Sequence, residues 1–154
     1  MDVDKVSEYF EVNHVIEQAL KIYQELFSLQ IIPIENTKTW QEDVKCYQVK
    51  DKNDVLGYFY LDIFDRKNKG GAFESIPLIH GIRSKDGTIH PSVSVMLAKF
   101  RKSKETAKPS LLRHHDVTIF FHEIGHIFHQ MSTEAKYIPF SGTHVEDDFV
   151  EMPS

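Results

Sequence analysis

Apolar residues recur at helical spacing near the start of the chain, between residues 14 and 28. These apolar positions are Val15, Ile16, Ala19, Leu20, Ile22, Tyr23, Leu26 and Phe27. The spacing predicts an amphipathic helix with one face on the core. We expect Asn13 to cap its N-terminus, because an asparagine side chain accepts hydrogen bonds from first-turn N–H groups. The segment 32–36, which contains Pro33, ends the pattern.

The middle of the chain predicts strands, because aromatic and β-branched residues gather in short runs bounded by turn residues. Residues 44–49 and 55–64 flank the polar turn 51–54 and are expected to form a hairpin. Residues 73–79 and 93–100 are two further strand candidates, and Asp86-Gly87 marks a tight turn between them.

A second helix is predicted over residues 116–131, and its apolar residues cover most of its faces. They are Val117, Ile119, Phe120, Phe121, Ile124, Ile127, Phe128 and Met131. A helix of this kind is largely buried, so the polar residues on it need partners.

The same helix carries the motif H-E-x-x-H at His122, Glu123 and His126. Positions i and i+4 lie on one helix face, which places both imidazoles within reach of one zinc ion. Zinc lowers the pKa of a bound water toward ~7, and Glu123 is placed to take its proton. The alternative is an ordinary helix with two surface histidines, since the motif also occurs by chance.

A catalytic zinc site needs a third protein ligand. His129 follows one turn after His126, where it would crowd the first two histidines, so we expect it to be a helix-face residue. The acidic segment 146–151 offers Glu146, Asp148 and Glu151. Spacing alone does not choose among them. If the segment is helical, Asp148 and Glu151 share a face, so that one could bind zinc while the other orients a histidine.

Composition narrows the class of protein and its partners. The formal charge of −5 and the lack of a basic stripe argue against nucleic acid. No apolar run approaches the ~20 residues of a membrane span. Cys46 is the only cysteine, so an internal disulfide is excluded and a reducing compartment is expected. The acidic N-terminus lacks a signal-peptide core. We therefore expect a cytoplasmic protein, or a mitochondrial one if a targeting segment is missing.

Several motifs then occur together along the chain. They are YF at 9–10, YQEL at 23–26, GYFYLD at 57–62, DR at 65–66, PSLLRH at 109–114, FHEIGHIFHQ at 121–130 and FSGTHVEDDFVEMPS at 140–154. Together they resemble the thimet oligopeptidase, neurolysin and oligopeptidase A family of zinc metallopeptidases. The resemblance implies that His122, His126 and Glu151 are the zinc ligands and that Glu123 is the catalytic base. Asp148 stays a candidate for orienting a ligand.

The predicted elements indicate an α+β fold: an N-terminal helix, a small mainly antiparallel sheet, the zinc-binding helix and the start of the helix with Glu151. This is the order expected in zinc peptidases. In such peptidases the strand before the zinc helix is often an exposed edge to which a peptide adds. Residues 93–100 are therefore one candidate edge, and an interior strand is the alternative. We expect residues 1–154 to be a single partial domain, the zinc-binding part of a larger, mostly helical peptidase.

The expected activity is zinc-dependent hydrolysis of internal bonds in short peptides. The Gly70-Gly71-Ala72-Phe73 loop is more similar to the bacterial and dipeptidyl carboxypeptidase branch, whereas the Ser141–His144 loop is more similar to thimet oligopeptidase. Two alternatives stay open: a zinc-binding but inactive fragment, and a peptide-binding module that lacks the C-terminal catalytic segments.

Overall fold

The computed structural model describes residues 2–71, 73–105 and 107–153. Residues 72 and 154, which belong to segments quoted for the resemblance, lie outside the described part, as do residues 1 and 106. In chain order the elements are α1 (Val3–Ser7), α2 (Val12–Phe27), β1 (Gln30–Pro33), β2 (Lys45–Asp51), β3 (Asp54–Phe64), β4 (Glu74–Ile79), β5 (Ile82–Arg83), β6 (Ile89–His90), β7 (Ser92–Phe100), α3 (His114–Met131), a 3₁₀ turn (Ile138–Phe140) and α4 (Asp147–Val150).

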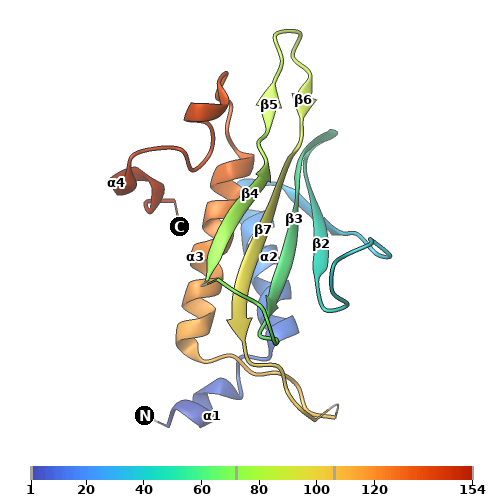
Figure 1. The fold of residues 1–154 in the computed structure, drawn as a ribbon, viewed down its shortest axis with the longest axis vertical. Helices are drawn as coiled ribbons and strands as arrows, with labels where there is room; N and C mark the ends of the chain where they lie inside the picture. Colours follow the sequence, from blue (N-terminus) through green and yellow to red (C-terminus); the bar gives the residue numbers. More distant parts are fainter. Residues whose placement is uncertain (1, 72, 106, 154) are drawn as a thin grey trace.

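One sheet and two helices form the body of the molecule. The strand order is β1-β2-β3-β7-β4, and α2 and α3 cover one face of this sheet (Figure 1). Strands β5 and β6 pair separately and extend beyond it. The predicted α+β fold with a mainly antiparallel sheet is confirmed, because only the β3–β7 pair is parallel among the described strand pairs.

The core lies between the sheet and the helices. Strand β3 alternates, so that Phe59 and Leu61 point into the core and are fully buried. Met96 of β7 and Phe120 and Ile124 of α3 meet them there and are also fully buried. Burying each such side chain contributes ~1.5–3 kcal/mol, so this contact layer holds α3 on the sheet.

Gly57 allows β3 and β7 to approach closely at the start of their parallel pairing. A Cβ at this position would lie 2.5 Å from Ser92 Oγ and 2.8 Å from Ser92 O. A rotation of the Ser92 side chain could relieve the first contact but not the second, because Ser92 O belongs to the backbone. Glycine is therefore required where these two strands meet.

The order of the strands corrects one prediction. Strand β7 lies between β3 and β4, so the prediction that residues 93–100 form an exposed edge is wrong and the interior alternative is confirmed. The edge strand beside β7 is β4, which also contacts α3. The alternation of residues within one strand does not reveal which strands lie beside it. Here β4 pairs with β7 on the side that faces away from β3.

The ends of the first long helix differ slightly from expectation. Helix α2 begins at Val12, and Glu11 caps it, because its carboxylate accepts hydrogen bonds from the backbone N–H groups of Asn13 (3.0 Å) and His14 (2.8 Å). The prediction of Asn13 as the cap is wrong by two residues. Ser28 ends the helix in a left-handed conformation (φ 56°).

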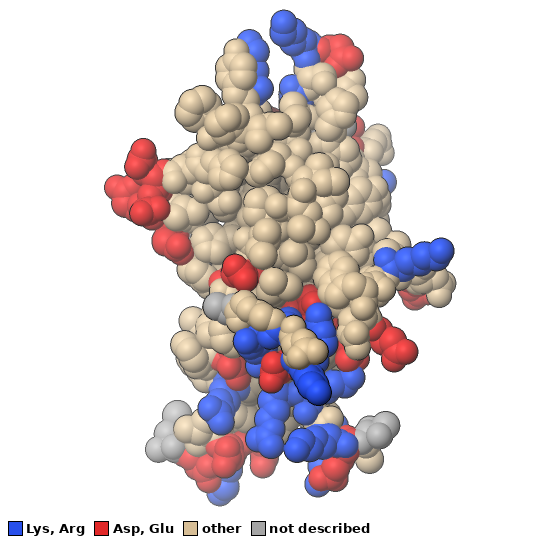
Figure 2. All heavy atoms as spheres, viewed as in Figure 1, with Lys and Arg blue, Asp and Glu red and all other residues tan. Residues whose placement is uncertain are grey.

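Charged side chains are unevenly distributed over the surface. Figure 2 shows Lys and Arg gathered at the end of the molecule near α1 and the loop after β7, interspersed with Asp and Glu. Lys102 and Asp43, for example, form an ion pair of 2.6 Å there. Among the described residues, no helix has the length and hydropathy that a membrane crossing requires.

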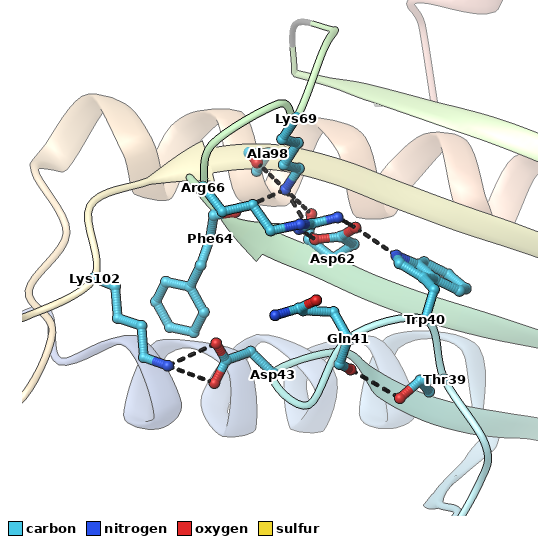
Figure 3. Close-up of polar contacts among 10 residues, drawn as sticks. All are labelled: Thr39, Trp40, Gln41, Asp43, Asp62, Phe64, Arg66, Lys69, Ala98 and Lys102. Carbon is cyan, nitrogen blue, oxygen red and sulfur yellow. Dashed lines mark hydrogen bonds and ion pairs between the residues drawn. The ribbon is translucent and has the colours of Figure 1, made fainter.

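A buried carboxylate lies at the end of β3, on the sheet face opposite the helices. Asp62 is 3% exposed and accepts hydrogen bonds from Arg66 through both oxygens (Figure 3). Trp40 Nε1 donates to it over 2.8 Å and Lys69 Nζ over 2.9 Å. Lys69 Nζ also donates to the backbone oxygens of Asp62, Phe64 and Ala98. The cluster therefore ties the loop after β3 to the ends of β3 and β7.

Candidate metal centre

Helix α3 presents two histidines one turn apart on one face. The Nε2 atoms of His122 and His126 are 3.2 Å apart, and the ring centroids are 4.6 Å apart at an interplanar angle of 82°. This arrangement follows from the i, i+4 spacing, which places both histidines on one face of α3. The apolar residues on the other side of the helix are buried in the core. The predicted helix over 116–131 and the pairing of the two imidazoles are confirmed.

A third polar group comes from the end of the chain. Glu151 follows α4, and its Oε2 lies 3.2 Å from His122 Nε2 and 3.4 Å from His126 Nε2. Ligand atoms held ~2.0–2.2 Å from one tetrahedral ion lie ~3.3–3.6 Å from one another. The three distances fit that geometry closely, so His122, His126 and Glu151 could hold one metal ion.

The group lies at the surface and is open on one side. The exposed fraction of the side chain is 40% for His122, 12% for His126 and 59% for Glu151. Within the described residues, this is the only set of three or more His, Cys, Asp or Glu side chains with converging ligand atoms. A solvent-exposed side leaves room for a water or a substrate atom.

Glu123 lies next to His122 but is buried. It is 5% exposed, and its Oε2 has no hydrogen-bond partner among the described residues. Its backbone oxygen accepts a hydrogen bond of 2.7 Å from Ser75 Oγ on β4. A buried, unpartnered carboxylate oxygen costs stability, which is characteristic of a group kept for chemistry rather than for folding.

His126 also has an unpartnered atom, its buried Nδ1. In many metal sites the second ring nitrogen of a ligand histidine donates to a carboxylate. Asp148 is exposed, and the structure records no hydrogen bond from it to either histidine within the described part of the chain. The prediction of Asp148 as the orienting group therefore finds no support. Glu146 is the N-cap residue of α4 and is outside the cluster.

His129 lies one turn after His126 and is also outside the cluster, as expected. Its ring contacts Phe149 of α4 edge-on, with 6.0 Å between the centroids. Burial of its ring is the main cause that lowers the pKa of His129, and the charge of the nearby His126 lowers it further. This histidine therefore contributes a contact between α3 and the short helix that precedes Glu151.

The loop before α4 packs tightly against α3. Gly142 has φ +58°, and a Cβ there would lie 3.0 Å from Gln130 Cα. Ser141 is buried beside it. This geometry favours a fixed connection whose glycine turns the chain.

Comparison with known proteins agrees with the geometry. The model of Peptidase family M3 matches residues 1–154. The chain belongs to peptidase family M3. This M3 chain is 43% identical over its whole length to a thimet-like oligopeptidase of Dictyostelium discoideum and 35% identical to saccharolysin of Saccharomyces cerevisiae. It is 33% identical over 98% of its length to oligopeptidase A of Haemophilus influenzae.

The M3 chain is much shorter than these relatives. It covers 23% of the Dictyostelium and Saccharomyces proteins and 22% of the Haemophilus protein. The family resemblance found in the sequence is confirmed. The roles of His122, Glu123, His126 and Glu151 stay predictions.

Sequence reasoning missed two residues of this region. The hydroxyl of Ser75 donates to the backbone oxygen of Glu123, and the side chain of Gln130 on α3 bonds to Ser75 and Ser94 of the sheet. The sequence places Ser75 only within a strand candidate and Gln130 only within the motif-bearing helix. No local pattern signals such contacts, because each depends on which strand packs beside α3.

Proposed function

We propose that this chain takes part in zinc-dependent hydrolysis of internal peptide bonds in short peptides. The observation that carries the proposal is the convergence of His122, His126 and Glu151 in a chain that belongs to peptidase family M3. Two imidazoles and one carboxylate form a donor set that suits Zn²⁺ and leaves a fourth position open. A bound zinc ion would polarise the scissile carbonyl of the peptide and lower the pKa of a bound water.

Glu123 has the position of a general base in this proposal. Its carboxylate is one residue from His122, and the unpartnered Oε2 is free to accept a proton and later deliver it to the leaving amine. Low exposure strengthens the interaction of this carboxylate with a nearby proton donor, since less water competes for it.

Strand β4 is the proposed binding edge for the peptide. It is an edge strand that contacts α3, so an extended peptide would pair along the side of β4 that faces away from β7. Main-chain pairing is independent of side-chain identity, which suits short peptides of varied sequence. We propose no nucleic-acid or membrane partner and keep the cytoplasm as the location, on the grounds of the single Cys46.

A second candidate is metal and peptide binding without turnover. It is favoured by the open side of the site, where the side chain of Glu151 is 59% exposed. Donors that stabilise a tetrahedral intermediate contribute ~3 kcal/mol each, so a chain without them would bind and not cleave.

The deciding test is zinc per chain by elemental analysis, on the parent and on Glu151→Ala. We expect about one zinc in the parent and clearly less in the variant. Glu146→Ala is the matched control, because Glu146 is a nearby glutamate outside the cluster, and it should retain the metal. A parent without zinc, or equal zinc in the parent and Glu151→Ala, would contradict the proposed site.

A further inference from the structure

A polar network crosses the otherwise apolar contact between α3 and the sheet. Ser75 Oγ on β4 donates to Glu123 O of α3 over 2.7 Å. About two turns further along α3, Gln130 Nε2 donates to Ser75 O over 3.4 Å. Ser94 Oγ on β7 donates to Gln130 Oε1 over 2.5 Å. The hydroxyl and the backbone oxygen of Ser75 therefore both bond to the helix that carries the metal-site histidines.

The chemistry of these groups fixes the direction of each bond. A backbone oxygen only accepts, so the amide nitrogen of Gln130 must face Ser75 O. The amide oxygen then faces Ser94, whose hydroxyl supplies the proton. Gln130 and Ser94 are 5% and 0% exposed, so water cannot replace a lost partner. A buried network of this kind is stable in one arrangement and costly in any other.

The network lies between the two parts that the proposed reaction must align. The histidines and Glu123 are on α3, whereas the peptide would pair with β4. Apolar side chains alone allow a helix to slide on a sheet, because their contacts have no direction. The bonds of Ser75 and Gln130 are directional, and they hold β4 at one height along α3 at the level of Glu123.

We propose that Ser75 and Gln130 are positioning residues, whose hydrogen bonds between β4 and α3 set where a bound peptide presents its scissile carbonyl to the site. This inference rests on the proposed function, because it needs the metal at His122, His126 and Glu151 and the peptide on β4. Neither residue touches the ligand atoms, so metal binding should not depend on them. A misplacement of ~1 Å costs ~100-fold in rate, which makes the network relevant to turnover.

The test uses the full chain loaded with Co²⁺, a paramagnetic substitute for Zn²⁺. Paramagnetic shifts of the β4 amides report the position of that strand relative to the metal. Ser75→Ala and Gln130→Met should change these shifts with cobalt affinity unchanged. In the zinc form, cleavage of a short fluorogenic peptide should show kcat reduced ~10- to 100-fold, with a smaller effect on KM.

Two further variants separate positioning from a loss of folding. Ser75→Thr restores the hydroxyl and should return both the shifts and kcat to the parent values. Ser92→Ala is the matched control on β7, because Ser92 is buried and its hydroxyl has no partner among the described residues. It should leave both readouts unchanged.

Each of the remaining outcomes contradicts one part of the proposal. If cobalt binds and the β4 shifts of Ser75→Ala and Gln130→Met equal those of the parent, the positioning inference is wrong. If the strand moves and kcat is unchanged, its role in catalysis is wrong. A parent that binds no cobalt overturns the metal site itself, and the inference with it.

Discussion

Two buried carboxylates of this chain have opposite surroundings. Asp62 is 3% exposed, and donors from Arg66, Trp40 and Lys69 satisfy both of its oxygens (Figure 3). Glu123 is 5% exposed, and its Oε2 has no partner among the described residues. The first arrangement stabilises the fold, whereas the second is costly for the fold and suited to proton transfer. Similar burial therefore accompanies two different uses of a carboxylate.

The electrostatics of Asp62 show what its donors contribute. Burial alone would raise the pKa of Asp62, but the hydrogen bonds from Arg66, Trp40 and Lys69, together with the charge of Lys69, outweigh it and lower the pKa to about 2. The carboxylate is thus held in its charged form, so it acts as a fixed anchor and exchanges no proton near neutrality.

The largest expected effect comes from Glu123→Gln, which removes the proposed base and keeps the shape of the side chain. Cleavage of a short peptide by the zinc-loaded chain should fall ~10³-fold, since general acid–base catalysis contributes on this order. The zinc content should stay at the parent level, as elemental analysis would show. Retained cleavage would mean that Glu123 is not the base. A parent that binds peptide and does not cleave it would favour the binding module.

The same carboxylate-to-amide change at Asp62 should act on stability instead. Asp62→Asn weakens charge-assisted hydrogen bonds to Arg66 and Lys69, so the free energy of unfolding should fall by ~2 kcal/mol. Glu123→Gln should leave the stability of the metal-free chain unchanged or raise it, because it replaces an unpartnered carboxylate. Urea unfolding of both variants measures this difference in sign. Equal destabilisation by the two changes would contradict the comparison.

The contribution of Asp62 should also depend on pH. Its pKa is lowered from 3.8 to about 2 in the folded chain, so its stabilisation is present above pH ~4 and is lost as the pH falls toward 2. The difference in unfolding free energy between the parent and Asp62→Asn should therefore be constant from pH 7 to ~5. It should shrink at lower pH. A difference that grows on acidification would have the wrong sign.

The smallest predicted effect concerns His129, which contacts Phe149 near the metal site. His129→Ala removes a ring–ring contact worth ~1 kcal/mol and should weaken zinc binding modestly, because α4 is then held less firmly. His129→Phe keeps a ring at this position and removes the buried, unpartnered Nδ1, so zinc affinity should match the parent. Isothermal titration of zinc compares the two. A large loss of affinity in His129→Phe would instead indicate a role for the ring nitrogen.

Local sequence patterns predicted most elements of the fold. The helical spacing around Leu20 and Ile124 reflects burial against one layer, and the alternation through Phe59 and Leu61 reflects a sheet with one face in the core. The i, i+4 histidines met as expected, since that contact is set within one helix. These predictions succeed because each depends on residues close together in the chain.

The predictions that failed depend on distant segments. The position of residues 93–100 in the interior of the sheet depends on β4, which lies on the far side of them. Spacing left Glu146, Asp148 and Glu151 open as ligands, because the path of the chain between His126 and α4 is set by the packing of Gly142 on Gln130. The segment 32–36 is predicted only to end the helix, and its first two residues belong instead to β1 (Gln30–Pro33), which is held by its pairing with β2.

The order of the strands has a consequence for how the chain reaches its native state. Strands β4 and β7 pair as the two arms of one long hairpin that continues through β5 and β6, whereas β7 pairs in parallel with β3 across an intervening stretch that contains β4. The parallel pairing of β3 with β7 is the less local of the two and forms slowly, because a long loop must close before any contact compensates for its entropy. Helix α3 follows all of these strands. We therefore expect the alignment of β4 with α3 to be among the last features to appear during folding.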